Sequence, residues 1–108
     1  TRGMISTIYG QAVKSVCLAD IHRAYEKWYD KEPFVRLLSQ GSFPAMSHVR
    51  GTNCCDIGCH FDADTGRVIL VSAIDNLLKG AAGQAVQNMN IMFGLADEMG
   101  LNYVQTPL

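Results

Sequence analysis

The chain has 108 residues, 48% of them hydrophobic, and a net charge of −1, with nine lysine and arginine residues against ten acidic ones. This length predicts a single domain with a modest core. The basic residues are scattered between Arg2 and Lys79 rather than gathered into a stripe, which argues against a protein that binds nucleic acid or an anionic membrane surface.

Residues 3–14 are rich in Ile, Thr, Tyr and Val without strict alternation, which predicts a mostly buried strand. Because the chain opens on this run without an initiator methionine, we expect a fragment of a longer protein. Asp20 is then the expected N-cap of a helix. The helix face expected to pack consists of Ile21, Ala24, Tyr25, Trp28 and Tyr29, at helical spacing. The positions expected to face solvent are His22, Arg23, Glu26, Lys27 and Asp30.

The middle of the chain predicts three strands. Pro33 ends the helix, "PFVRLL" is typical of a short strand, and "SQGSFPAMS" is expected to be an exposed loop. Residues 54–74 predict a hairpin whose turn is "DADTG". The second arm, "RVILVSAI", has apolar residues on both faces, so we expect cover on both.

A final helix is predicted over residues 78–93, with apolar residues at helical spacing and Gly94 as its C-terminal glycine. Gly80 and Gly83 weaken helix propensity but let a backbone or a flat ligand approach closely. The longest uncharged stretch, from Gly80 to Ala96, contains several carboxamides and is too polar for a membrane span, so we expect none. The apolar positions of the helix are Ala82, Val86, Met89 and Phe93.

The stretch "GTNCCDIGCHFD", residues 51–62, contains three cysteines and a histidine. Strand alternation places Cys55 and Cys59 on one face and Cys54 and His60 on the other. A zinc site needs converging ligands and a second pair, which this spacing does not supply, so no metal is expected. A catalytic thiol is the alternative, but nothing nearby lowers a thiol pKa. We expect reduced cysteines that fill the core of a protein in a cytosol-like compartment.

The stretch "AIDNLLKGAAGQAVQNMN", residues 73–90, carries the stronger functional signal. A buried strand ends at Asp75 and Asn76, and a helix rich in glycine, alanine and carboxamides follows. Its backbone N–H groups and amides suit a phosphate or a nicotinamide carboxamide. The alternative is a close-packed helix whose amides cap neighbouring loops. Arg2 and Arg50 are each compatible with an anion contact or with a surface position.

Four segments read "TRGMISTIY", "YDKEPFVRLL", "HVRGTNCCDIG" and "AIDNLLKGAAGQAVQNMNIMFGL". Together they resemble the C-terminal third of the N-acetyl-gamma-glutamyl-phosphate reductase family, and the resemblance runs along essentially the whole chain. The "DN" before a glycine-containing helix also resembles the cofactor-side segment of the wider glyceraldehyde-phosphate and aspartate-semialdehyde dehydrogenase class.

The resemblance implies an α+β fold, with a mixed or antiparallel sheet and flanking helices. Residues 1–75 would form part of a substrate and dimerisation domain. Residues 76–108 would form a helix and tail that return to a Rossmann domain absent from this sequence. The implied protein is a cytoplasmic homo-oligomer.

The resemblance also implies the chemistry. In this family a cysteine of a "GNPGC" motif attacks an acyl phosphate, and NADPH reduces the resulting thioester to the semialdehyde with a histidine as acid and base. Neither "GNPGC" nor the histidine motif "HRHxPE" occurs here, so we expect the catalytic residues upstream of Thr1 and an inactive isolated chain. The implied NADP contacts are Asn76, aligned with the asparagine at the nicotinamide carboxamide, followed by Lys79, Gly80 and Gln84, and the substrate-side candidate is Arg2.

Two rival functions remain open at this point. The first is an aspartate-semialdehyde dehydrogenase-like enzyme, which acts on a shorter acyl phosphate without the N-acetyl group. The second is a non-catalytic interaction or scaffold domain of the same fold.

Overall fold

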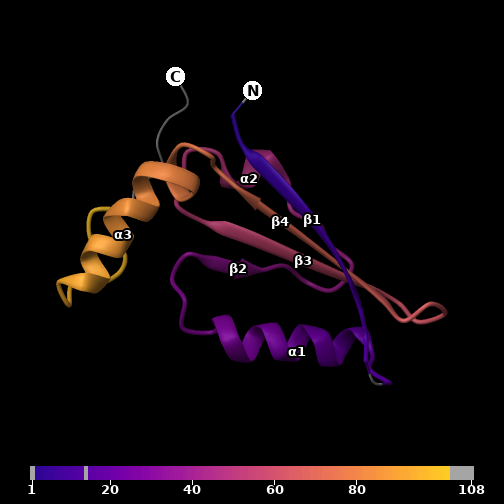
Figure 1. Cartoon of the computed structure of the whole chain (residues 1–108). Helices are drawn as coiled ribbons and strands as arrows, with labels where there is room; N and C mark the ends of the chain where they lie inside the picture. Colours follow the sequence, from indigo (N-terminus) through magenta and orange to yellow (C-terminus); the bar gives the residue numbers. More distant parts are fainter. Residues whose placement is uncertain (1, 14, 103–108) are drawn as a thin grey trace.

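The computed structural model describes residues 2–13 and 15–102 (Figure 1). Four strands form one mixed sheet in the order β1-β4-β3-β2. β4 pairs antiparallel with both β1 and β3, whereas β2 pairs parallel with β3, which confirms the expected α+β class. The elements in chain order are β1 (Met4–Gln11), α1 (Leu18–Tyr29), β2 (Val35–Leu37), α2 (Met46–Val49), β3 (Cys55–Asp62), β4 (Arg67–Ile74), the π-helical turn η1 (Leu78–Ala82) and α3 (Gly83–Met92).

The predicted hairpin is confirmed as β3 and β4, with Cys55 opposite Ile74 and Asp62 opposite Arg67. Its turn is stabilised by Asp62, whose carboxylate accepts hydrogen bonds from the Asp64 amide and the Thr65 hydroxyl. The Thr65 bond is the main cause that lowers the pKa of Asp62. The "DADTG" cluster therefore acts as a turn through local side-chain bonds, as the composition predicts.

Helix α1 lies along β2 and β3 (Figure 1), but two details differ from the expectation. The N-cap is Cys17, and Asp20 instead occupies the third helical position, where its carboxylate accepts the Cys17 backbone N–H at 3.0 Å. This is a capping box, in which the acidic side chain reaches back by three residues. His22 was expected in solvent, yet its Nε2 atom donates to the Leu38 carbonyl at 2.9 Å.

The aromatic side of α1 is incompletely covered. Trp28 is 79% exposed, although helical spacing places it on the apolar face. The reason is that α1 packs against β3 and against β2, which is an edge strand of only three residues. The sheet is too narrow to cover the whole apolar stripe. A hollow of about 380 Å³ lies there, lined by Ala24, Tyr25, Trp28 and Tyr29.

The burial of strand β1 also differs from the expectation. We expected it to be mostly buried, but all eight of its residues are exposed. β1 forms one edge of the sheet and pairs with β4, and within the described residues nothing covers it enough to bury a side chain. Cover of β4 is also partial, because only Ala73 is fully buried there.

The apolar core is small because the described structure is flat, with extents of 44 × 34 × 18 Å. A thickness of 18 Å corresponds to about one sheet and one layer of helices. A sheet needs a layer on each side to bury both of its faces. The buried apolar residues are Phe34, Val49, Cys59, Ala73 and Leu101.

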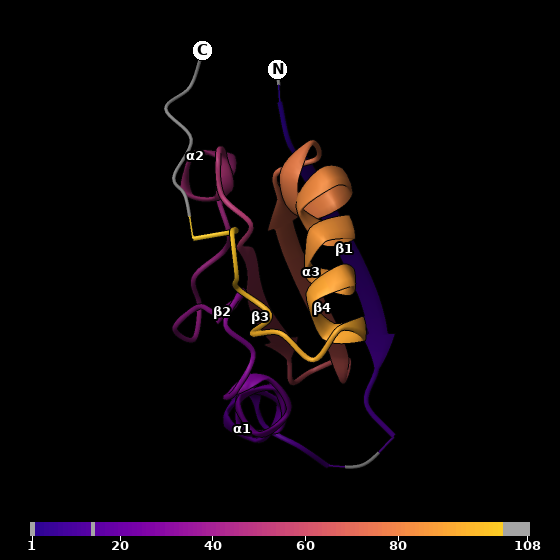
Figure 2. The same ribbon diagram turned by 90° about the vertical axis from the view of Figure 1, so that its left-hand side faces the viewer.

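The final helix has the predicted extent, since η1 and α3 together span residues 78–92 and Gly94 follows with a φ of +67°. Its buried face was not predicted. The buried positions of α3 are Gly83, Gln87 and Asn90, whereas Met89 and Phe93 of the apolar stripe are exposed. Figure 2 shows that the chain after α3 turns back beside the helix, and Gln87 and Asn90 form hydrogen bonds with this tail.

Candidate functional site

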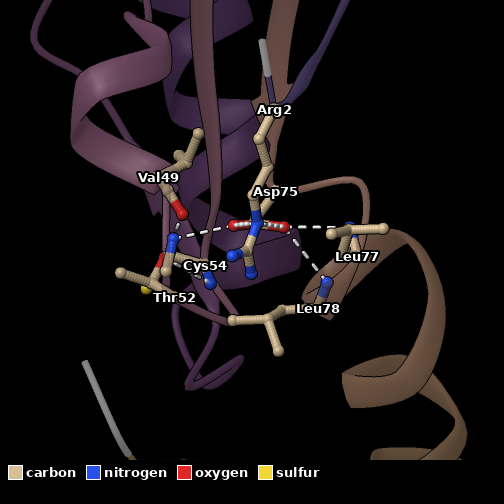
Figure 3. A network of polar contacts seen from close by, with 8 residues as sticks. Arg2, Val49, Thr52, Cys54, Asp75, Leu77 and Leu78 are labelled. Atoms are coloured by element: carbon tan, nitrogen blue, oxygen red, sulfur yellow. Dashed lines mark hydrogen bonds and ion pairs between the residues drawn. The ribbon is translucent and has the colours of Figure 1, made fainter. Parts of the chain in front are cut away.

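A buried carboxylate, Asp75, lies where β4 ends and the helical segment begins (Figure 3). Its side chain is completely buried and forms an ion pair with Arg2, with the Nε to Oδ2 distance at 2.8 Å. Oδ2 also accepts the Gly51 amide at 2.7 Å, and Oδ1 accepts the amides of Leu77 and Leu78 at 2.9 and 3.2 Å. One carboxylate therefore joins the start of β1, the loop after α2 and the first turn of the helix.

The helical segment starts with a π-helical turn. The Gly80 amide donates to the Asp75 carbonyl and the Ala82 amide donates to the Leu77 carbonyl, each across five residues. Such turns are rare and frequently lie at functional sites. Here the turn follows directly from the position where Asp75 accepts two amides, so the buried carboxylate and the unusual helix start form one unit.

Asn76 follows Asp75 and lies within this capped turn. Its Oδ1 atom is buried, and no donor among the described residues reaches it. A buried carbonyl oxygen without a partner costs free energy unless a donor outside the chain satisfies it. The amide group of a carboxamide is such a donor, so the chemistry of Asn76 fits the nicotinamide contact that the resemblance implies.

Arg2 lies in the same cluster but is committed to Asp75. Its Nε atom contacts both carboxylate oxygens, at 3.0 and 2.8 Å, and its side chain is 28% exposed. The structure therefore brings the substrate-side candidate Arg2 next to the cofactor candidate Asn76 through the carboxylate between them. Arg50 is exposed, and no ion pair involves it within the described ranges.

The other three candidates lie elsewhere on the helix. Lys79 Nζ donates to Gln87 Oε1 at 2.7 Å and lies 5.5 Å from the centre of the Phe34 ring. Gln84 donates to Asn88 one helical turn later, at 2.9 Å. Gly80 approaches the body of the sheet. The atoms nearest to a Cβ built there belong to Ile74, Asp75 and Met4.

The polar side of α3 binds the tail. Asn90 Nδ2 donates to the carbonyls of Asp97 and Met99 at 3.0 and 2.9 Å. Gln87 links Lys79 to the Asp97 carboxylate. These bonds confirm the alternative in which the helix amides cap neighbouring loops, at least for these residues. A shallow hollow of about 150 Å³ remains beside η1, lined by Asn53, Leu78, Ala82, Gly83, Val86, Gly100 and Leu101. None of the five candidate site residues lines it.

The surroundings of Asp75 and Lys79 shift the pKa values of both side chains. Burial of the Asp75 carboxyl raises its pKa, but the bonds from the Gly51 amide, from Arg2 and from two further amides prevail, so the pKa lies below its ordinary value of 3.8. Burial lowers the pKa of Lys79 below 10.5, partly opposed by the nearby Cys55 thiol. Asp75 is therefore a fixed negative charge at neutral pH.

The expectation that the cysteines fill the core holds only for Cys59, because Cys17 is exposed and Cys54 lies before β3 rather than in it. Cys59 is 2% exposed, Cys54 and Cys55 are half-buried, and all four cysteines are free. Burial raises the pKa of the Cys55 and Cys59 thiols. No group of three or more metal-binding side chains converges within the described residues.

Alkylation should follow this burial. We expect iodoacetamide to modify Cys17 at least about tenfold faster than Cys59, because Cys17 is exposed and Cys59 is buried and protonated. Peptide mass spectrometry over a time course would measure both rates. Equal rates at the two cysteines would contradict the packing of α1 against β3.

The main residue that sequence reasoning missed is Asp75 itself, together with Gly51. The available signal was an aspartate directly before a helix, which is a common cap. Arg2 lies 73 positions and Gly51 lies 24 positions from Asp75 in the sequence. No local sequence pattern therefore predicts these two contacts.

Comparison with protein families gives a match to the semialdehyde dehydrogenase dimerisation domain over residues 1–76. Among solved structures, aspartate semialdehyde dehydrogenase II from Vibrio cholerae, complexed with ASA, has a similar fold. The TM-score is 0.65 at 18% identity, and the likeness covers 86% of this chain and 27% of that one.

Curated relatives are more similar in sequence. N-acetyl-gamma-glutamyl-phosphate reductase from Geobacter sp. (strain M21) is 59% identical over 101 residues, and the reductase from Desulforapulum autotrophicum is 60% identical over 101 residues. Each match covers 94% of this chain but only 29% of the relative. The chain therefore spans less than a third of the length of these relatives. Over the described part of the chain, no helix is long and apolar enough to cross a membrane.

Proposed function

Because this chain belongs to the semialdehyde dehydrogenase dimerisation-domain family, we propose that it is the C-terminal part of an NADP-dependent reductase. The proposed reaction converts N-acetyl-gamma-glutamyl phosphate to N-acetylglutamate semialdehyde, a step of arginine biosynthesis. The observation that carries this proposal is the 57–60% identity to reductases of that name over at least 93% of the chain. The catalytic cysteine and histidine belong to the rest of the protein, so this segment alone is inactive.

We propose that residues 76–108 of this chain form one side of the cofactor-binding site. NADPH, when bound, supplies the hydride that reduces the thioester. Asn76 contributes the acceptor for the nicotinamide carboxamide, since its Oδ1 is buried without a donor in the described structure. Gly80 lets the first helical turn lie close to the sheet, while Lys79 and Gln84 support the helix beside the cofactor. Arg2 faces the substrate side from its ion pair with Asp75.

Strand β1 and the end of α3 each expose apolar side chains, and we propose a different partner for each surface. Residues 1–75 form the dimerisation surface, for which the exposed strand β1 and the family description provide support. α3 and the tail pack on the Rossmann domain of the same protein, since Met92 and Phe93 are otherwise exposed apolar side chains. Large exposed apolar patches usually mark such interfaces. Four free cysteines support a cytoplasmic location.

The decisive experiment is a turnover assay of the full-length protein with two acyl phosphates, followed by NADPH absorbance. We expect reduction of N-acetyl-gamma-glutamyl phosphate to be faster than reduction of aspartyl phosphate. Faster reduction of aspartyl phosphate would favour the aspartate-semialdehyde dehydrogenase alternative. Absence of activity with both substrates, in a folded protein, would favour the scaffold alternative.

A second measurement tests Asn76. Asn76→Ala in the full-length protein should weaken NADPH binding roughly fivefold to tenfold, which corresponds to one lost hydrogen bond. Isothermal calorimetry would measure the dissociation constant. The matched control is Gln40→Ala, which removes an exposed carboxamide from the loop before α2 and should leave binding unchanged. Equal affinity in Asn76→Ala and wild type would remove Asn76 from the cofactor site.

A further inference from the structure

Asp75 has no capacity left for a ligand of its own. Both of its oxygens contact Arg2, Oδ2 also accepts the Gly51 amide, and Oδ1 accepts two further amides. The side chain is completely buried. A carboxylate in this state does not bind a cofactor directly, because its lone pairs already have donors.

The bonds of Asp75 constrain the backbone around its neighbour Asn76. Its side chain accepts the amides two and three residues ahead, Leu77 and Leu78, and its carbonyl accepts the Gly80 amide. Asn76 lies inside the ring closed by the first of these bonds. These bonds fix the backbone on both sides of Asn76, which limits the conformations open to its side chain.

The two adjacent residues thus have opposite properties. The carboxylate of Asp75 is saturated by contacts within the chain, whereas the Oδ1 of Asn76 is buried with no donor in the described structure. An acceptor held in place before binding loses less side-chain freedom when a ligand arrives. A saturated residue beside an unsatisfied one is the arrangement expected of a support and the group that it supports.

We propose that Asp75 is a positioning residue that holds Asn76 toward the nicotinamide carboxamide, with Arg2 and the Gly51 amide as its anchors. This inference rests on the proposed function, because it requires that Asn76 contact the cofactor. Arg2 would then help to hold Asn76 in place through its ion pair with Asp75, in addition to any contact with the substrate.

The fold offers a matched control for the loss of a buried ion pair. Asp56 is 1% exposed and pairs with Arg36 Nε at 2.6 Å, in the interior of strand β3 rather than beside an asparagine. Asp56→Asn, like Asp75→Asn, neutralises a buried carboxylate that is paired with an arginine. General destabilisation should appear in both variants, whereas an effect on the nicotinamide end should appear only in Asp75→Asn.

The experiment is a double-mutant cycle in the full-length protein, with Asp75→Asn, Asn76→Ala and both together. Calorimetry would measure binding of NADPH and of 2′-phospho-ADP-ribose, which lacks the nicotinamide. We expect Asp75→Asn to weaken NADPH binding roughly fivefold, comparable to the loss of one hydrogen bond, and to leave 2′-phospho-ADP-ribose binding unchanged. After Asn76→Ala, adding Asp75→Asn should cause no further loss.

Several results would overturn the proposal. Equal loss of affinity for both ligands in Asp75→Asn, or losses that add in the double variant, would show a merely structural role. An effect of Asn76→Ala without any effect of Asp75→Asn would remove the positioning role and leave the proposed function intact. No effect of Asn76→Ala would instead contradict the proposed cofactor contact.

If Asp75→Asn does not fold, Arg2→Gln provides the same cycle. It removes the side-chain anchor and leaves the three backbone amides on the carboxylate. We expect roughly a threefold loss of NADPH affinity that disappears in the Asn76→Ala background. Unchanged NADPH affinity in Arg2→Gln would then contradict the proposal.

Discussion

Replacing Gly58 with alanine is expected to destabilise the fold by about 3 kcal/mol, the upper range for an added methyl group in a packed site. Gly58 lies in the interior of β3, and a Cβ built there would be 2.5 Å from the Ser42 carbonyl oxygen and 3.1 Å from Pro44 Cδ. The Ser42 carbonyl belongs to the backbone, so it cannot move aside like the end of a flexible side chain. Urea denaturation followed by circular dichroism would measure the change.

The control is the same substitution at the edge of the same sheet. Gly10 lies in β1, and a Cβ there meets nothing within 4 Å. Gly10→Ala should therefore be neutral or stabilise by roughly 0.5 kcal/mol, because alanine has less freedom than glycine in the unfolded chain. If the two variants were equally stable, the loop containing Ser42 would not lie on β3 as described.

Asp75→Ala is expected to have the largest effect of all, a loss of about 3–5 kcal/mol, as when one partner of a buried ion pair is removed. The change leaves Arg2 and three backbone amides without their acceptor. Asp64→Ala, at an exposed turn position, should change stability by no more than about 0.5 kcal/mol. Urea denaturation of both variants at neutral pH provides the comparison.

The same carboxylate predicts a pH dependence. The pKa of Asp75 is lower in the folded protein than the ordinary 3.8, so its ionised form stabilises the folded state. That stabilisation is fully present above about pH 5 and is lost as the pH falls below 3.8 and through the folded-state pKa. The stability difference between wild type and Asp75→Ala should therefore shrink below pH 3.8. A difference that stays constant on acidification would contradict the ionised, paired state of Asp75.

Features with local causes were predictable from the sequence. The hairpin follows from two apolar runs around "DADTG", whose Asp62 makes its bonds within three residues. The extents of α1 and of the final helix follow from periodicity and from the terminal Gly94. The error at Asp20 is small and instructive. A capping box places an acidic residue three positions after the cap, and the polar side chain alone does not distinguish the two positions.

The covered faces were not predictable, because periodicity identifies an apolar stripe but not what lies against it. α3 has such a stripe, yet its buried residues are Gly83, Gln87 and Asn90. Gln87 and Asn90 bind the returning tail, whereas Gly83 lies against Asn53. β1 has the composition of a core strand and is exposed throughout. Under the proposed function, the exposed apolar residues of β1 and α3 would face other parts of the full-length protein.

By itself the sequence determined the fold class, the order of the main elements and the family, because these depend on local spacing and on residue identity. The choice of Asn76 came from the resemblance and stays a prediction. Only the tertiary structure decided the partners of Asp75. Arg2 and Gly51 approach it from 73 and 24 positions away, and a contact over that distance is created by the sheet that brings the segments together. The physical reason is that a buried charge requires partners, but the sequence does not state which part of the chain supplies them.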